Sequence, residues 1–186
     1  MKPKRQKITE KIFLYKDSTS CFTYLIDDEK KVLIDAGTFP DTQIDLVVIT
    51  HCHFDHILFL NEIKQKFNCK IAVGKKDAKS VEKLNERTLK YMSTKNLVPV
   101  KIDMRLKDGD MIKTGKYTFV VIETPGHTPG SISLYERNYK ILFSGDAWFG
   151  EDFRGRTIYP GGNENDSLNT LIKLKKLDIK FLLPGH

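Results

Sequence analysis

Metal-binding side chains are concentrated in the segment His51-Cys-His-Phe-Asp-His56, which holds three of the chain's five histidines. In a chain of this composition, the pattern H-x-H-x-D-H would arise by chance in roughly 3 of 10,000 sequences. The apolar run Leu46–Ile49 predicts a buried strand before it, and side-chain alternation along that strand places His51 and His53 on one side and Cys52 on the other. Imidazole and carboxylate groups are ligands for zinc, iron or manganese. The segment therefore predicts a metal site.

The other candidate ligands stand at or just past the ends of predicted strands. Asp55 and His56 lie on the turn that opens the next predicted helix. Three further donors directly follow a strand and a glycine, which allows a tight turn: His127, Asp146 and His186. A lone histidine is more often a hydrogen-bonded core residue, but five histidines and two aspartates in this arrangement favour a shared metal centre.

Short apolar runs bounded by turn residues predict the elements that must position these donors. The predicted strands are Ile12–Tyr15, Cys21–Ile26, Lys31–Ile34, Leu46–Ile49, Ile71–Val73, Val98–Ile102, Tyr117–Glu123, Ser131–Tyr135, Ile141–Phe143 and Lys180–Leu183. The predicted helices are Ile57–Phe67, Lys76–Tyr91 and a last one capped by Asp166 or Ser167, with Leu168, Leu171, Leu174 and Leu177 on one face. Two runs of strands, each followed by helices, predict helices outside packed sheets.

Composition limits the class of protein. The 186 residues, 40% of them hydrophobic, suit one domain spanning 1–186 with a real core. We find no membrane-spanning apolar stretch and no signal sequence, and three scattered cysteines indicate reduced thiols, so we expect a cytoplasmic protein that does not bind membranes.

The net charge of +7 is typical of a protein whose charged residues form a solvated surface. It also suits a small anionic substrate better than nucleic acid, because nucleic-acid-binding motifs are missing. Oligomeric state is left open.

Together these motifs resemble the metallo-β-lactamase fold superfamily, in particular its hydroxyacylglutathione hydrolase (glyoxalase II)-like branch. The resemblance covers nearly the whole chain and is carried by five segments: Leu33-Ile-Asp-Ala-Gly37, Thr50-His-x-His-x-Asp-His56, Thr124-Pro-Gly-His127, Ser144-Gly-Asp146 and Pro184-Gly-His186. It implies an α/β (α+β) fold, a four-layer αββα sandwich with a dinuclear metal site at one edge. Fold alone does not determine the substrate.

The resemblance also implies a role for each donor. One metal would be held by His51, His53 and His127, and the other by Asp55, His56 and His186. Asp146 would bridge the two metals, and Asp55 and Asp146 would be the catalytic carboxylates. Asp35 matches a position that supports the ligand loops, with capping of a turn as the alternative.

The expected activity is hydrolysis of a thioester, ester or lactone. The cofactors would be two divalent metal ions, zinc first and iron or manganese as alternatives, which lower the pKa of water and supply hydroxide near neutral pH. No nucleophilic side chain is needed, so we expect Cys52 to be a bystander. Aromatic residues near the ligands could line a pocket: Phe54, Trp148, Phe149, Phe153 and Tyr159.

Three other functions stay open. Gly155-Arg-Thr157 partly resembles a mononuclear iron persulfide dioxygenase, although the cysteine usual in that branch is missing. The positive charge slightly favours an RNA-processing nuclease of the same fold, and a non-catalytic metal-binding module is the last alternative. The sequence ends at His186, before the C-terminal helical region that forms much of the glutathione site in glyoxalase II, so the resemblance does not specify glutathione thioesters.

Overall fold

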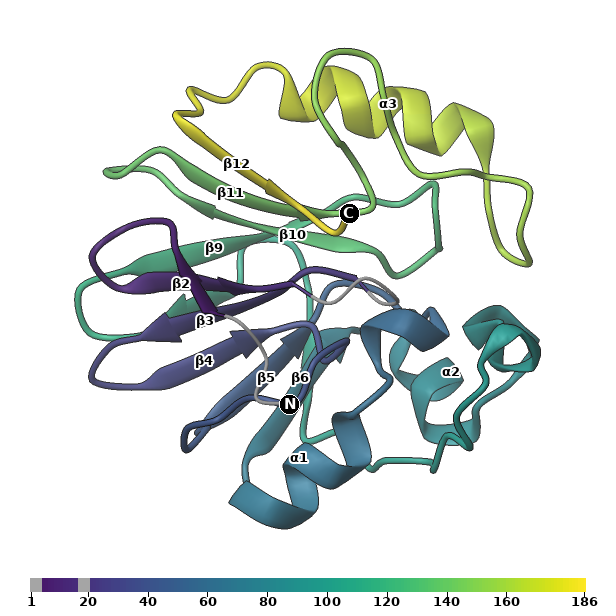
Figure 1. The fold of residues 1–186 in the computed structure, drawn as a ribbon. Coiled ribbons are helices and arrows are strands. Elements are labelled where there is room, and N and C mark those ends of the chain that lie inside the picture. The colour runs from purple at the N-terminus through teal and green to yellow at the C-terminus, as the bar shows by residue number, and fades with distance from the viewer. Residues whose placement is uncertain (1–4, 17–20) are drawn as a thin grey trace.

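The computed structural model describes residues 5–16 and 21–186, whose strands form two sheets packed face to face (Figure 1). In these residues the first sheet has seven strands paired in chain order. They are β1 (Arg5–Lys7), β2 (Ile12–Tyr15), β3 (Thr23–Asp27), β4 (Lys31–Ile34), β5 (Leu46–Ile49), β6 (Lys70–Gly74) and β7 (Met104–Leu106). Pairing is antiparallel from β1 to β4 and parallel from β4 to β7.

The second sheet contains five strands of the described chain, in the order β12-β11-β10-β9-β8. Their bounds are β8 (Met111–Lys113), β9 (Thr118–Glu123), β10 (Ile132–Glu136), β11 (Ile141–Gly145) and β12 (Phe181–Pro184). The strands β11 and β12 are parallel, and the other neighbours are antiparallel.

Helices cover the outer faces of both sheets. The helices α1 (Leu60–Phe67) and α2 (Ala78–Lys83) pack on the first sheet, and α3 (Glu164–Leu174) packs on the second (Figure 1). This arrangement confirms the predicted αββα layers. Three 3₁₀ turns complete the described elements: η1 (Phe54–His56), η2 (Glu86–Thr88) and η3 (Lys90–Met92). Among the described residues, no helix combines the length and apolar character needed to cross a bilayer.

Strand β5 shows how the sequence builds the layers. Its residues Leu46 and Val48 pack in the core between the sheets, and Val47 and Ile49 pack in the core under α1 and α2. All four side chains are buried, because the strand has one neighbouring layer on each face. The alternation explains the continuous apolar run and fixes where the histidine segment begins.

The predicted helix Lys76–Tyr91 is wrong beyond its first turns. The helix α2 ends at Lys83, because Leu84 takes the left-handed conformation with φ 46°. Asn85 then caps the short turn η2 by accepting a hydrogen bond from the Arg87 backbone N–H. Asparagine prefers such caps to helix interiors, so the amphipathic pattern continues while the helix does not.

The predicted strand Val98–Ile102 is also wrong. Val100 and Ile102 are buried under the helices, but the strand that pairs with β6 is β7, which begins at Met104. The alternation of apolar residues in this segment thus reflects the burial of Val100 and Ile102, and the segment does not pair as a strand. The edge strands β1, β7 and β8 have three residues each and were not predicted, since so few residues give no periodic signal.

The ends of α1 and α3 differ from the prediction. An α-helical conformation starts at Leu60 rather than Ile57. Asn163 caps α3 by accepting from the Asp166 backbone N–H, so neither Asp166 nor Ser167 is the cap. Of the four predicted leucines, Leu171 and Leu174 are buried on α3, Leu168 is 41% exposed, and Leu177 lies beyond the helix.

Candidate metal centre

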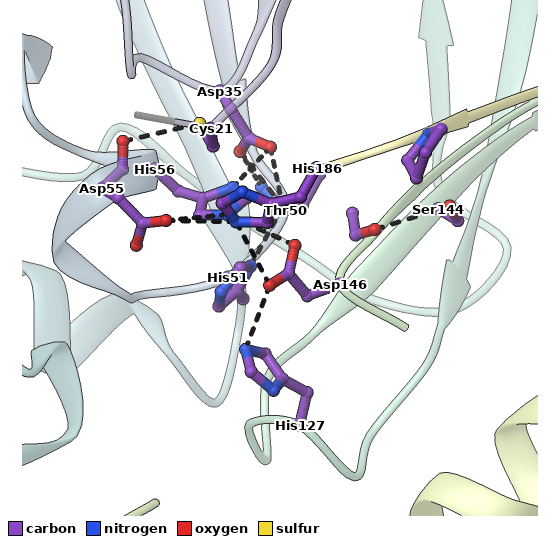
Figure 2. A network of polar contacts seen from close by, with 12 residues as sticks. Cys21, Asp35, Thr50, His51, Asp55, His56, His127, Ser144, Asp146 and His186 are labelled. Atoms are coloured by element: carbon purple, nitrogen blue, oxygen red, sulfur yellow. Dashed lines mark hydrogen bonds and ion pairs between the residues drawn. The ribbon is translucent and has the colours of Figure 1, made fainter. Parts of the chain in front are cut away.

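All seven predicted metal-binding residues meet at one edge of the two sheets. The histidine segment follows β5, and the other donors follow β9, β11 and β12. Figure 2, which labels all of these residues except His53, shows the labelled side chains converging from both sheets. Every residue of the predicted set belongs to at least one group of closely spaced donor atoms: His51, His53, Asp55, His56, His127, Asp146 and His186.

The first group contains His51, His53 and His127. One nitrogen from each ring lies within 4.8 Å of the others, and all three residues are buried. The Nδ1–H of His127 donates to the backbone carbonyl of Arg156 at 2.7 Å, which leaves Nε2 as the free acceptor. This fixed ring orientation is typical of a histidine that binds a metal.

The second group contains Asp55, His56 and His186. The distance from His186 Nε2 to Asp55 Oδ2 is 3.2 Å, and from His56 Nε2 to Asp55 Oδ2 it is 3.7 Å. His56 is fully buried, whereas the side chain of His186 is 46% exposed. One side of this group is therefore open.

Asp146 stands between the two groups. Its Oδ1 lies 3.4 Å from His56 Nε2, and its Oδ2 lies 3.5 Å from His127 Nε2 and 3.6 Å from His186 Nε2 (Figure 2). A single carboxylate thus faces histidines of both groups, which is the arrangement that a bridging ligand requires.

Five buried donor atoms of the site have no hydrogen-bond partner among the described residues. They are Nε2 of His51, His53, His56 and His127, and Oδ1 of Asp146. Leaving one buried polar atom unpaired costs about 1–3 kcal/mol. Five such atoms in one place are explained if cations take their lone pairs, so the residues fit a metal centre.

The protonation states of four of the donors suit the same interpretation. Burial lowers the pKa of His53 to about 3 and that of His51 well below its usual value, so both imidazoles are neutral. Burial, the largest single influence, would raise the pKa of Asp55 and Asp146, but the surrounding histidines together outweigh it, His56 most of all, and both pKa values are lowered. Neutral imidazoles and ionised carboxylates are the forms that bind metals.

Asp35 supports the ligands from β4, as predicted. It is 2% exposed, and its Oδ2 accepts from His56 Nδ1 at 2.8 Å. Its Oδ1 accepts from the Thr50 backbone N–H, also at 2.8 Å, so it fixes the end of β5 as well. The side-chain hydrogen bonds found for Asp35 come from Thr50 and His56 and none comes from the turn after β4, so the contacts favour support of the ligands over capping of that turn.

The glycine before His186 allows the chain to pass against the site. A Cβ atom at Gly185 would lie 2.2 Å from Asp146 Oδ1 and 2.8 Å from the ring of His56. The Gly185 backbone is held in place, since its N–H donates to the Gly145 carbonyl and its carbonyl accepts from the Phe22 N–H. Any larger residue would displace a donor group.

A cavity of about 580 Å³ opens onto the donors. Of the five aromatic residues considered from the sequence, Phe54, Phe149 and Tyr159 line it. Trp148 packs under α3 instead, and Phe153 is 68% exposed. Five lining residues were not predicted to lie there, because no spacing pattern marks them: Leu89, Met92, Arg154, Gly155 and Arg156.

The two arginines differ in what they contact. Arg154 forms an ion pair with Glu164 at the start of α3. Arg156 is exposed, and its side chain takes part in none of the ion pairs found among the described residues. Arg156 is therefore a cation at the cavity that is free to bind an anionic group.

Comparison with known proteins links this geometry to one family. A model of the metallo-beta-lactamase superfamily matches residues 17–186. A protein of Methanocaldococcus jannaschii named probable metallo-hydrolase is 32% identical over 181 residues, covering 88% of this chain and 86% of that protein.

Two further relatives carry more specific names. The hydroxyacylglutathione hydrolase of Bdellovibrio bacteriovorus is 35% identical over 170 residues; the match covers 86% of this chain but only 59% of that protein. The crystal structure of BLEG-1, a B3 metallo-beta-lactamase, superposes with a TM-score of 0.76 at 26% identity, covering 91% of this chain and 88% of that one.

Proposed function

Because the chain belongs to the metallo-β-lactamase superfamily, we propose that it hydrolyses a small anionic thioester, ester or lactone at a dinuclear metal centre. The observation that carries this proposal is the convergence of seven donor residues, which between them have five buried donor atoms without a hydrogen-bond partner. Names of relatives such as hydroxyacylglutathione hydrolase support a thioester in particular.

In this proposal each group of donors holds one metal ion. His51, His53 and His127 would hold the first, and Asp55, His56 and His186 the second, with Asp146 contributing to both. When bound, the two ions would lower the pKa of water and polarise the scissile carbonyl. We propose zinc because the donors are nitrogen and oxygen atoms, with iron and manganese as the alternatives to be decided by elemental analysis.

The two catalytic carboxylates have separate tasks. Asp55 and Asp146 both line the cavity, so both can reach a bound substrate. The lowered pKa of Asp55 keeps it ionised at neutral pH. We propose that it takes up the proton released by the attacking water and passes it to the leaving group. Asp146 holds the two donor groups at their mutual spacing.

The walls of the cavity support an anionic substrate with an apolar part. Arg156 can donate two parallel hydrogen bonds to a carboxylate of the substrate. Leu89, Met92 and Phe149 provide an apolar surface for the acyl group or leaving group. We also propose the cytoplasm as the location, because the three cysteines are buried free thiols, as a reducing compartment would keep them.

A hydrolysis screen on protein of measured metal content tests the function. Thioesters, lactones and phosphodiesters are offered to the zinc-loaded and the chelator-treated protein. We expect turnover of a thioester, ester or lactone only with about two metals per chain. Oxygen consumption with glutathione persulfide at one iron per chain would support the dioxygenase instead, and cleavage of transfer RNA would support the nuclease.

The substrate charge is tested with Arg156→Ala. We expect KM to rise about tenfold for a carboxylate-bearing thioester, with little change for a neutral thioester of the same acyl group. Arg137→Ala is the matched control, since Arg137 is an exposed arginine between β10 and β11 and does not line the cavity. Equal KM changes for both substrates, or for both variants, would contradict the role of Arg156.

A further inference from the structure

A buried carboxylate outside the donor set, that of Asp77, contacts both segments that carry the three-histidine group. Asp77 precedes α2 and has no exposed surface. An aspartate at this position normally caps the helix with its side chain. The Asp77 side chain makes no capping hydrogen bond, so its carboxylate is used elsewhere.

The carboxylate accepts three hydrogen bonds, all from outside α2. Oδ2 accepts from the Cys52 backbone N–H at 3.0 Å and from the Thr128 hydroxyl at 2.6 Å. Oδ1 accepts from the Gly130 backbone N–H at 2.9 Å. Cys52 lies between His51 and His53, and Thr128 follows His127. One side chain thus joins the loop after β5 to the loop before β10.

The fit between Asp77 and these loops is close. A Cβ atom at Gly130 would lie 2.3 Å from the Asp77 backbone nitrogen and 2.6 Å from its carboxyl carbon. No ion pair to Asp77 is found among the described residues, and burial raises its pKa. A buried carboxylate without a cation is costly, and its three hydrogen bonds offset that cost only while both loops stay in place.

We propose that Asp77 is a positioning residue of the metal centre, holding His51 and His53 at the distance from His127 that a shared metal ion requires. It acts through Cys52 and Thr128 and touches no donor atom. Without it, each loop keeps its own histidines but loses the link that sets their separation. The proposal concerns metal binding and stands whether or not the substrate is a thioester.

Three variants remove different numbers of the hydrogen bonds by which Asp77 joins the two loops. Asp77→Ala removes all three hydrogen bonds. Asp77→Asn keeps one acceptor oxygen, so it can keep the Cys52 and Thr128 bonds but turns an amide N–H toward the Gly130 N–H. Thr128→Val removes the hydroxyl that donates to Asp77, and with it that hydroxyl's contact with Ser131 Oγ at 2.8 Å, at nearly constant volume. It leaves the other two Asp77 bonds in place and serves if the Asp77 variants do not fold.

Asp28→Asn is the matched control. The Asp28 carboxylate likewise accepts from a backbone N–H, that of Lys116 at 2.6 Å, and from a threonine hydroxyl, that of Thr114 at 2.9 Å. It lies in the turn between β3 and β4, at the sheet edge opposite the donors. Its loss should lower stability without affecting the metal centre.

The measurements are the zinc affinity of the loaded protein, by competition with a chromophoric chelator, and the visible spectrum of the cobalt-loaded protein. We expect zinc affinity to fall about 10–100-fold in Asp77→Ala, as for other residues that orient ligands, and less in Asp77→Asn and Thr128→Val. The cobalt spectrum should change in the same order. Urea unfolding at fixed free zinc gives the stability of each variant.

Unchanged zinc affinity and cobalt spectrum in the folded Asp77 variants, with only a loss of stability like that of Asp28→Asn, would overturn the proposal. If the Asp77 variants do not fold, unchanged zinc affinity and spectrum in Thr128→Val would overturn it equally. A zinc affinity that falls as much in Asp28→Asn as in Asp77→Asn would also do so, because the effect would then follow global stability.

Discussion

Asp35 determines which nitrogen of His56 carries the proton. A carboxylate only accepts, so the 2.8 Å contact with Asp35 Oδ2 requires the proton on His56 Nδ1. The other nitrogen, Nε2, faces Asp55 and Asp146, and with Nδ1 held protonated it is the nitrogen that would give its lone pair to a metal bound there. Replacing the carboxylate by an amide should reverse this arrangement.

In Asp35→Asn the backbone can stay as it is, because asparagine tolerates the left-handed φ of 61° at this position. The amide oxygen is still needed by the Thr50 backbone N–H, so the amide N–H₂ faces His56 Nδ1. That contact favours the tautomer with the proton on Nε2, the atom that should bind the second metal.

The size of the effect follows from the hydrogen bond that is lost. Both partners are buried, and a hydrogen bond to a charged group contributes about 1.5–3 kcal/mol. This corresponds to about 10–150-fold weaker binding of the second metal. The three-histidine group makes no contact with Asp35 that would weaken the first metal by as much.

Elemental analysis after dialysis at graded zinc concentrations measures both affinities, and nitrogen-15 NMR of the histidine rings reports the tautomer of His56. Asp103→Asn is a suitable control, since Asp103 also accepts a backbone N–H, that of Ile71 at 2.8 Å, away from the site. Two zinc ions bound as tightly as in the wild type, with the proton still on Nδ1, would refute the reasoning.

Three further substitutions test individual residues. Asp146→Ala should abolish turnover while circular dichroism shows a folded protein, since the core lies in the sheets around it; activity within about tenfold of the wild type, 1.4 kcal/mol, would exclude the bridging role. His186→Ala should weaken the second metal but leave one tightly bound ion at the three-histidine group; two tightly bound ions would remove His186 from the ligand set. Cys52→Ser should keep near wild-type kcat/KM, because the thiol packs under the helices and burial raises its pKa; a large loss of rate at normal metal content would instead indicate a catalytic thiol.

The convergence of the proposed donor residues could be predicted because each one follows a strand that the apolar pattern marks clearly. A strand end fixes where the next side chain lies, so the type and spacing of His51 and His53 were enough. The alternation of side chains beyond β5 is less regular than the sequence pattern predicts. His51 and His53 share one side as predicted, but Cys52 packs in the same core as Ile49, although strict alternation would have placed it with Val48. The strand ends at Ile49, and the chain changes direction at Thr50.

Asp77 could not have been identified from the sequence in the same way. An aspartate before an amphipathic segment indicates a helix cap, and the structure shows it at that position without the capping bond. Its partners Cys52 and Thr128 lie 25 and 51 residues away in the chain. The spacing of residues within one segment cannot predict hydrogen bonds between residues so far apart in the chain.

The cavity wall shows why the chemistry of this protein is easier to infer than its substrate. Leu89 belongs to the segment predicted as one continuous helix, and Met92 directly follows that segment, which breaks at Leu84 and returns as two short turns. The break places Leu89, itself at φ 54°, against the cavity instead of on the face of a helix. A metal ligand must be one of a few residue types, and here each proposed ligand lies close to the end of a strand. The residues proposed to contact the substrate lie instead where the chain departs from regular structure. We therefore propose that the η2–η3 segment and the loop that carries Arg156 set the choice of substrate, and substitutions there should change KM between substrates while leaving metal content intact.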